Sequence, residues 1–218
     1  MLDRKKIEAE RERIPERVFR QEYGGEFIEG SGSVFRYVRE AATGEFAEPR
    51  PDETYYAGLD LAKVEDYSVL VIMDGNGRVV FFDRFHRLDW SLQIARVKAA
   101  TERFNHARTF VDTTGAGEPV FEALRKEELN VEAYPFTAKS KAALIDNLAL
   151  RLERRELTLP QTNLCPVLID ELEAFEFSVS DAGNVRTGAP GGMHDDCVIA
   201  LALAAWKARQ GQFWIEVW

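Results

Sequence analysis

Residues 55–86 read YYAGLDLAKVEDYSVLVIMDGNGRVVFFDRFH, and they hold three apolar runs separated by polar turns. The runs Tyr55–Asp60, Tyr67–Asp74 and Arg78–His86 are rich in Val, Ile, Phe and Tyr, which favour strands. Gly75-Asn76-Gly77, between the second and third runs, is typical of a tight hairpin turn. This stretch therefore predicts three antiparallel strands at the start of a compact domain.

Helical and strand patterns alternate after this hairpin. Ser91 is an expected N-cap for a helix through Phe104, and Ser140 leads a second helix with apolar residues at helical spacing. Further helices are predicted after the turn that follows residue 112, over 166–175 and over 195–208, and further strands over 108–112, 131–135, 157–159, 177–179 and 184–187. Three antiparallel strands followed by this alternation predict an α/β domain with a mixed central β-sheet flanked by helices.

The first 54 residues lack such a pattern. Dense alternating charge predicts a helix up to Ile14, and Pro15 then ends it or begins a new one. Residues 24–51 are rich in Gly, Glu and aromatic side chains without a clear period, which indicates a linker with short turns. We therefore expect an arm over residues 1–54, a compact domain over 55–210 and a tail over 211–218.

Composition limits the class of protein. A chain of 218 residues can bury a core without disulfides, and Cys165 and Cys197 have the isolated spacing of buried thiols in a reducing compartment. The first residues are charged, and the longest apolar run, 197–206, is too short to cross a membrane. We expect a soluble cytoplasmic protein with no membrane partner. A net charge of -9 argues against nonspecific coating of nucleic acid but does not exclude a nuclease.

Two aspartates end predicted strands. Asp60 follows Tyr-Ala-Gly-Leu, and Asp112 follows Thr-Phe-Val and precedes Thr-Thr-Gly-Ala-Gly. Ligands gather at the carboxyl ends of strands in open α/β sheets, and the amides of Gly115 and Gly117 could hold an anion there. Taken singly, either aspartate is explained as well by an exposed position or by a cap.

A third acidic position begins the last predicted helix. Asp195 and Asp196 follow His194 and a Gly-rich loop, and acids at a helix N-terminus are favoured by capping alone. The rest of this helix is apolar on every side, however, and such helices lie buried. Its acidic end is therefore expected to face into the protein. His194 is an expected outer neighbour of these acids, with a structural hydrogen bond as the simpler explanation.

Together these acids predict a divalent-metal site. Adjacent carboxylates raise one another's pKa, so a cluster of them calls for cations. Oxygen-only ligands suit Mg²⁺ or Mn²⁺. Two such ions, about 3.5–4 Å apart, would hold the attacking water and the leaving oxygen of a phosphodiester.

Several of these motifs, in this order, resemble the nuclease domain of the large terminase subunit of tailed phages. They are Leu-Asp60-Leu-Ala, Asp66-Tyr-Ser-Val-Leu-Val-Ile, Val-Asp112-Thr-Thr-Gly-Ala-Gly and His194-Asp195-Asp196. Pro15-Glu-Arg-Val-Phe-Arg-Gln-Glu-Tyr is similar to the segment that joins the ATPase and nuclease parts of that family, and Lys139-Ser-Lys141 before a long helix is similar too. The resemblance extends from about residue 14 to 206.

The resemblance implies an RNase H-like fold and cleavage of double-stranded viral DNA during genome packaging, with Mg²⁺ or Mn²⁺, by two-metal-ion hydrolysis. The family's catalytic and metal-binding acids fall on Asp60, Asp112 and the Asp195–Asp196 pair, within which the main ligand stays open. Candidate DNA contacts are Lys139, Lys141 and Arg84. No Walker A lysine motif is present, so we expect the ATPase domain to be absent from these residues. The implied partners of the full-length protein are that ATPase domain, the small terminase subunit and the portal or capsid, in the cytoplasm of the infected host cell.

Three alternatives stay open at this stage. One is another RNase H-like nuclease, such as a junction resolvase or an RNA-strand hydrolase. A second is an actin-like phosphotransferase of the hexokinase type, which would need a second motif copy and an adenosine site for which the chain has no room. A third is a DNA-binding or assembly module with weak catalysis, against which the four acids count.

Overall fold

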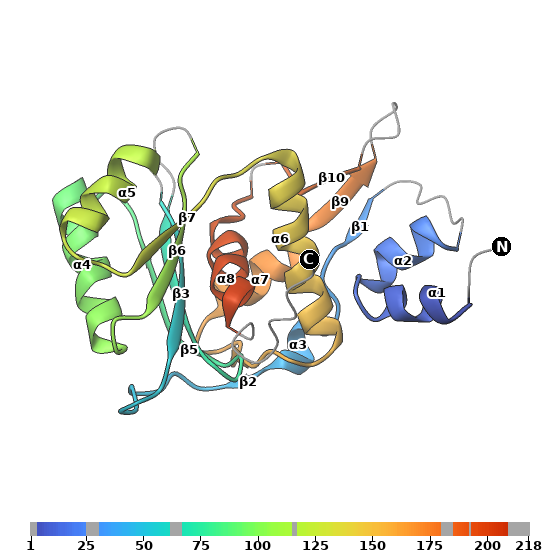
Figure 1. Cartoon of the computed structure of the whole chain (residues 1–218), viewed down its shortest axis with the longest axis horizontal. Helices are drawn as coiled ribbons and strands as arrows, with labels where there is room; N and C mark the ends of the chain where they lie inside the picture. Colours follow the sequence, from blue (N-terminus) through green and yellow to red (C-terminus); the bar gives the residue numbers. More distant parts are fainter. Residues whose placement is uncertain are drawn as a thin grey trace.

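A five-stranded mixed sheet forms the centre of the computed structural model, which describes residues 4–24, 31–61, 67–114, 117–179, 185–191 and 193–208 (Figure 1). The strand order is β5-β4-β3-β6-β7. The strands are β3 (Tyr55–Asp60), β4 (Ser68–Asp74), β5 (Val79–Phe85), β6 (Arg108–Asp112) and β7 (Val131–Tyr134). β3 pairs antiparallel with β4 and parallel with β6, which confirms the predicted α/β fold with a mixed sheet and its opening antiparallel strands.

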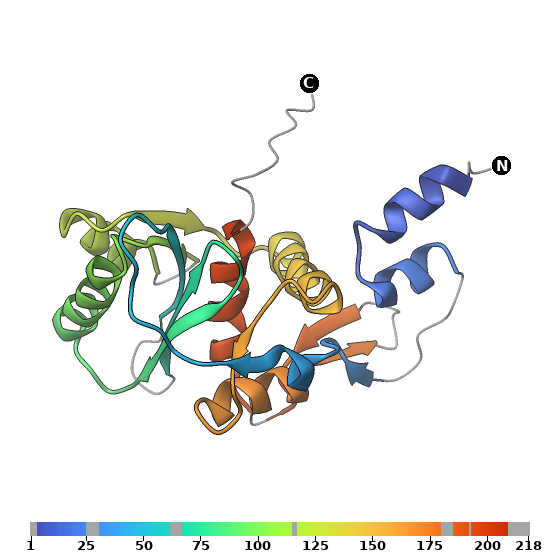
Figure 2. The same ribbon diagram turned by 90° about the horizontal axis from the view of Figure 1, so that it is seen from below.

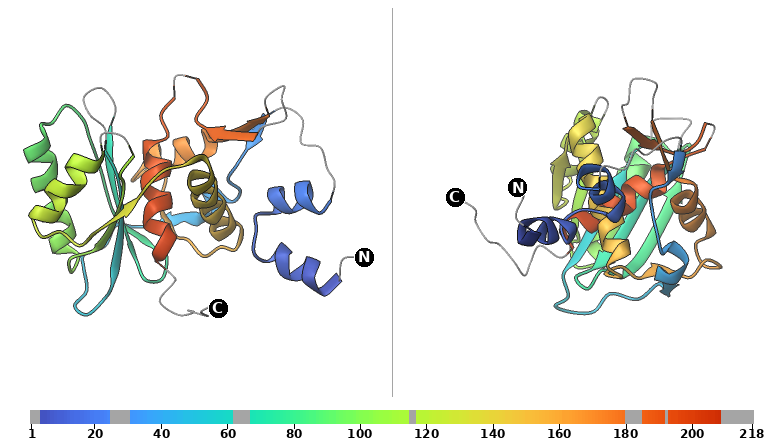
Figure 3. Two further views of the ribbon diagram at one scale, coloured as in Figure 1. Left: turned by 45° about the horizontal axis from the view of Figure 1, so that its top comes forward. Right: turned by 90° about the vertical axis from the view of Figure 1, so that its right-hand side faces the viewer.

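Helices cover both faces of this sheet (Figure 2). On one face, α4 (Trp90–Arg103) and α5 (Gly117–Lys126) pack over Ala57 and Leu59 of β3. On the other face lies α8 (Asp196–Lys207), with α6 (Ala138–Glu153) and α7 (Pro166–Ala174) packed around it (Figure 3). Successive strand residues point to opposite faces, so β3 contributes to both cores.

α8 is the most buried helix among the described residues. Every residue from Cys197 to Ala205 is buried, as its all-round apolar sequence predicts. It can lie directly on β3 because Gly58 has no side chain, since a Cβ there would sit 1.9 Å from the carbonyl oxygen of Ala200. At 12 residues α8 is too short to span a bilayer, and no other helix in the described ranges is long and apolar enough to do so.

The structure differs from the linker predicted over residues 24–51. β1 (Ser31–Ser33) pairs with β9 (Glu176–Val179), which also pairs with β10 (Val185–Gly188) as the predicted late hairpin. α3 (Val38–Ala41) leads into β2 (Ala42–Gly44), which pairs with β8 (Leu159–Pro160). Val34, Phe35 and Val38 are buried in the core that surrounds α8. Short segments of this kind have no periodic pattern, although they contribute to the core; the division of the chain at Tyr55 stays a prediction.

Two short helices precede these strands. α1 (Arg4–Arg11) and α2 (Glu16–Glu22) are separated at Pro15, which is the N-cap of α2. The pair lies beyond α6, on the side away from the main sheet (Figure 2). α2 is attached there by the Glu16 amide, which donates to Glu153 at 3.0 Å, and by Arg17, which pairs with Asp146 at 3.0 Å.

The helix predicted to be capped by Ser91 begins earlier than expected. The N-cap of α4 is Asp89, whose carboxylate accepts from the backbone amide of Leu92 at 2.9 Å. Ser91 instead donates its hydroxyl to the same carboxylate at 2.6 Å. Both residues are good acceptors, and the one that precedes the first helical residue satisfies the helix terminus.

Asp89→Ala is expected to lower the melting temperature by about 2–4 °C, because it removes this cap. Asp89→Asn, which keeps an acceptor oxygen, should retain most of the lost stability. Thermal unfolding followed by circular dichroism measures both. A larger loss from Ser91→Ala than from Asp89→Ala would contradict the assignment of the cap.

Candidate functional site

Asp60 and Asp112 lie side by side at the carboxyl ends of β3 and β6. Leu59 is aligned with Val111 across the two parallel strands, and both side chains enter the core under α4 and α5. The residue after each must point to the opposite face. The two carboxylates therefore share the face on which α8 packs.

α8 brings the other two acids to the same place. Its backbone at Ala200 lies over Gly58, two residues before Asp60, and its first residue, Asp196, lies one helical turn before Ala200. Asp195 is the N-cap residue of α8, yet its side chain makes no capping hydrogen bond. Simple helix capping therefore does not account for Asp195, and the structure brings together all four acids singled out from the sequence.

The clustered negative charges have their largest effect on the pKa of Asp60. Burial raises the pKa of its carboxyl well above the ordinary range, and the charges of Asp196, Asp195 and Asp112 raise it further. Lys141 acts in the opposite direction on that pKa. A site of this kind binds a proton or another cation more readily than an isolated aspartate does.

Lys141 is the nearest positive side chain to these acids that the structure describes. It extends from the first turn of α6, and its Nζ lies 3.4 Å from Oδ2 of Asp195. Thr137 and Ser140 form a reciprocal capping box at the start of α6, which fixes the turn that carries this lysine. Lys141, predicted as a DNA contact, thus also offsets charge inside the acidic cluster.

The two described residues that follow β6, Thr113 and Thr114, are held in place by hydrogen bonds of Asp112 and Thr114. Oδ1 of Asp112 accepts from the amide of Thr114 at 2.8 Å, and the hydroxyl of Thr114 accepts from the amide of Phe136 at 2.7 Å. Asp112 is thereby fixed between the ends of β6 and β7. Gly115, predicted to help hold an anion, lies outside the described residues.

The donors at the site are carboxylate oxygens, with one ammonium beside them. This set suits a hard divalent cation, because repulsion among the carboxylates at Asp60 is relieved by added positive charge. Within the described ranges, no three His, Cys, Asp or Glu side chains are already close enough together to hold a metal ion. The observation that favours a cation is therefore the electrostatic clustering and not a finished ligand cage.

The remaining predicted site residues have distinct surroundings. Lys139 is exposed at the start of α6. Arg84 lies with its guanidinium carbon 3.4 Å from the ring centroid of Tyr67 and with Nη2 3.6 Å from Glu171. His194 lies with Nδ1 3.7 Å from Oδ2 of Asp196. Arg84 is thus packed among protein groups, and its role as a DNA contact stays a prediction.

Glu171 and Tyr67 are the site neighbours that sequence reasoning missed. Oε2 of Glu171 accepts from the amide of Cys197, in the first turn of α8, at 2.9 Å. A signal for Glu171 is present in the sequence of α7, because Leu168 lies one turn before it and places it on the buried face of that helix. No comparable signal distinguishes Tyr67.

Comparison with known proteins finds relatives that match most of this chain. A family model described as the terminase RNaseH-like domain matches residues 57–207. The large terminase subunit of Thermus virus P23-45 is 37% identical over 202 residues, covering 88% of this chain and 41% of that protein. The chain thus spans about two fifths of the length of this relative.

Solved structures give the same result. The large terminase nuclease of the thermophilic phage G20c with bound magnesium has a TM-score of 0.74 and 32% identity, covering 80% of this chain and 97% of that chain. The large terminase nuclease domain of Thermus phage P74-26 also has a TM-score of 0.74, with 31% identity over 85% of this chain and 100% of that chain.

Proposed function

Because this chain belongs to the terminase RNase H-like domain family, we propose that it is a divalent-metal-dependent endonuclease that cleaves double-stranded viral DNA during genome packaging. The observation that carries the proposal is the gathering of Asp112, Asp195 and Asp196 around the half-buried carboxylate of Asp60. The bound magnesium in the G20c large terminase nuclease supports the choice of cofactor.

In this proposal, Asp60, Asp112, Asp195 and Asp196 hold Mg²⁺ or Mn²⁺, with two ions as the expected number. Bound there, the ions would activate water for attack on the phosphodiester and stabilise the leaving 3′ oxygen. Asp60 and Asp112 have backbone positions fixed by the sheet, and Asp195 and Asp196 are the N-cap and the first residue of the buried helix α8. Rigid elements of this kind hold reacting groups in a constant geometry.

The positive side chains on α6 have two roles in the proposal. Lys141 shields Asp195 at 3.4 Å before ions and DNA bind. Lys139, exposed on the same turn, contacts a DNA phosphate near the scissile bond. Arg84 is the less favoured DNA contact, since its guanidinium is stacked on Tyr67.

The wider assembly is also proposed from the relatives. Since the chain covers 41% of the large terminase subunit of Thermus virus P23-45, we expect the complete protein to include an ATPase domain. The small terminase subunit and the portal or capsid are its expected partners in the infected host cell. The ATPase would move the DNA that this domain cuts.

Metal removal tests the proposal. Supercoiled plasmid should be nicked and linearised with Mn²⁺ or Mg²⁺, and addition of EDTA should stop the reaction, because four clustered carboxylates cannot bind a phosphate-bearing strand without cations. Agarose gel electrophoresis gives the rate. Four-way junctions and RNA–DNA hybrids serve as comparison substrates. Cutting that persists in EDTA, or a strong preference for junctions or hybrids over duplex DNA, would overturn the proposed activity.

A further inference from the structure

We infer that Glu171 of α7 and Arg84 of β5 are positioning residues that together hold the Asp195–Asp196 end of α8 against β3. The inference rests on the proposed function, because it concerns the acids proposed to bind metal. It assigns to Arg84 a role inside the protein that differs from the DNA contact expected from the sequence.

Glu171 takes the place of a missing helix cap. The first amides of a helix have no partner within it, and Asp195 does not supply one from its side chain. Glu171 supplies it from a different helix: its Oε2 accepts from the Cys197 amide at 2.9 Å in a buried contact. With 6% of its surface exposed, Glu171 anchors the start of α8 from beneath the acids.

Arg84 connects the same carboxylate to the side chain of Asp196. Its Nη2 lies 3.6 Å from Oε1 of Glu171, and its guanidinium stacks on Tyr67. The rings of Tyr67 and His194 meet edge to face with centroids 5.7 Å apart. Nδ1 of His194 in turn lies 3.7 Å from Oδ2 of Asp196. From Glu171, one path of contacts therefore reaches the backbone of α8 and another reaches the carboxylate of Asp196.

The energetics favour a joint role for the two residues. A buried carboxylate is costly unless a positive partner and hydrogen bonds compensate it, and removing one partner leaves the other uncompensated. Glu171 has both kinds of compensation, from Arg84 and from the start of α8. Groups that orient metal-binding side chains commonly change metal affinity or activity by about 10–100-fold when they are removed.

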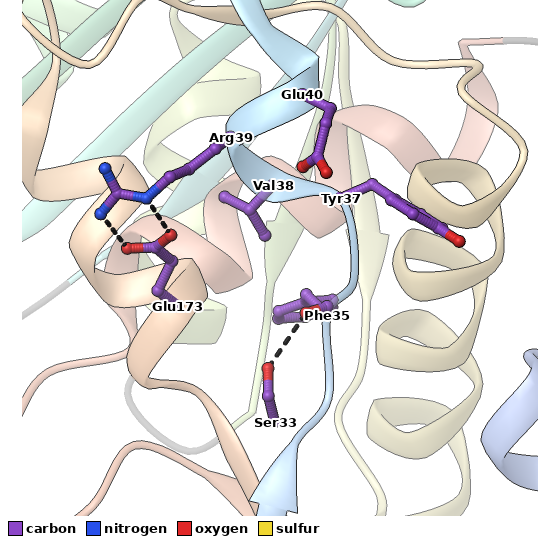
Figure 4. A pocket seen from close by; sticks show the side chains of 7 residues that line it. All are labelled: Ser33, Phe35, Tyr37, Val38, Arg39, Glu40 and Glu173. Carbon is purple, nitrogen blue, oxygen red and sulfur yellow. Dashed lines mark hydrogen bonds and ion pairs between the residues drawn. The ribbon is translucent and has the colours of Figure 1, made fainter.

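A second arginine–glutamate pair on the same helix provides a matched control. Glu173 lies two residues after Glu171 and pairs with Arg39 of α3, with two N···O distances of 2.6 Å (Figure 4). This pair is exposed and lines a surface hollow of about 410 Å³ together with Ser33 and Phe35. It shares the chemistry and the helix of the positioning pair but lies on the surface, and no contact described for it reaches an acid of the site.

The experiment compares Glu171→Gln, Arg84→Met and their double variant with Glu173→Gln, Arg39→Met and theirs. Glutamine at position 171 keeps an acceptor for the Cys197 amide but loses the charge that attracts Arg84. Mn²⁺ affinity is measured by calorimetry, plasmid cleavage at saturating Mn²⁺ by gel, and the melting temperature in EDTA. We expect Mn²⁺ affinity to fall by about 10-fold or more in both single variants, with little further loss in the double variant. The control variants should keep the Mn²⁺ affinity and rate of the unchanged protein.

Three results would overturn the inference. Folded Glu171→Gln and Arg84→Met proteins that bind Mn²⁺ as tightly as the unchanged protein would leave the pair with a structural role alone. If the losses of Mn²⁺ affinity in the two single variants add up in the double variant, Glu171 and Arg84 act independently and not as a pair. Equal losses in the control variants would point to general destabilisation. Arg84 is 20% exposed, so Arg84→Met keeps the inference testable even if the Glu171 variant does not fold.

The design also separates this inference from the proposed function. If the unchanged protein neither binds Mn²⁺ nor cuts plasmid, both ideas fail together. If the unchanged protein does both, and the Glu171 and Arg84 variants bind Mn²⁺ and cut plasmid as it does, only the positioning role of the two residues fails.

Discussion

Asp60→Asn is expected to abolish DNA cleavage while making the metal-free protein more stable. Asparagine has the shape of aspartate but cannot carry the negative charge that a divalent cation needs, so cleavage should fall on the order of 1,000-fold or more. Plasmid cleavage with Mn²⁺ measures this loss. Asp170→Asn, at an exposed acid of α7, is the control and should cut at the unchanged rate.

The gain in stability follows from the electrostatics of the same carboxyl. Burial and the charges of Asp196, Asp195 and Asp112 raise the pKa of Asp60 in the folded protein above its unfolded value. The folded state then holds a proton that the unfolded state has lost, so ionisation of Asp60 lowers the free energy of unfolding as pH rises. The Asp60→Asn substitution would remove that penalty at neutral pH, and the gain should disappear near the ordinary pKa of aspartate.

Thermal unfolding in EDTA, measured from acidic to neutral pH, tests the expected gain in stability. The difference in melting temperature between the variant and the unchanged protein should grow from acidic to neutral pH. A variant that is inactive but less stable at neutral pH would contradict the charge repulsion. A variant that is more stable and still cleaves DNA would show that Asp60 is not needed for cleavage.

Gly58→Ala is expected to have the largest effect on stability. The added Cβ would lie 1.9 Å from the Ala200 carbonyl oxygen and 2.5 Å from the Ala204 amide nitrogen, and both are backbone atoms of a buried helix. Neither can move without displacing α8 from β3, so we expect a loss of roughly 3 kcal/mol or more in the free energy of unfolding. Denaturant unfolding in EDTA measures it.

Gly75→Ala is the matched control, because the nearest atom to its added Cβ is the Thr54 carbonyl oxygen at an ordinary 3.8 Å. This variant should unfold at nearly the same denaturant concentration as the unchanged protein. The Gly58 variant should also lose Mn²⁺ affinity, because a displaced α8 carries Asp195 and Asp196 away from Asp60. A Gly58→Ala protein of normal stability would show that α8 does not pack on β3 at this distance.

Much of the sheet could be predicted from local pattern. β3, β4 and β5 follow from apolar runs and a Gly-Asn-Gly turn, and β6 coincides with the predicted 108–112. Because side chains alternate between the two faces of a sheet, Asp60 and Asp112 lie on the same face once β3 and β6 are paired. The buried position of α8 also follows from the sequence, because a helix that is apolar on every side has no polar face to expose to solvent.

The rest depends on contacts between distant segments. Val34, Phe35 and Val38 lie between the short strands β1 and β2, in segments with no period. Only the pairing of those two strands with β9 and β8 brings this part of the chain to the core. Asp89 and Ser91 are both good caps, and the start of α4 at Trp90 decides which one serves the helix. The role of Gly58 depends on the close approach of the α8 backbone, which lies far away in the sequence.

The pairing of β3 with α8 has a consequence for the biosynthesis of the protein. β3, β4 and β6 are synthesised well before the residues of α8 that complete the acidic cluster. Contacts of such large sequence separation form late in folding, because the intervening loop must first be closed. A nascent or partly folded chain would hold Asp60 and Asp112 without their partners. The acidic cluster would therefore be complete only after α8 has packed on β3, and under the proposed function a chain without this contact would have no complete metal site.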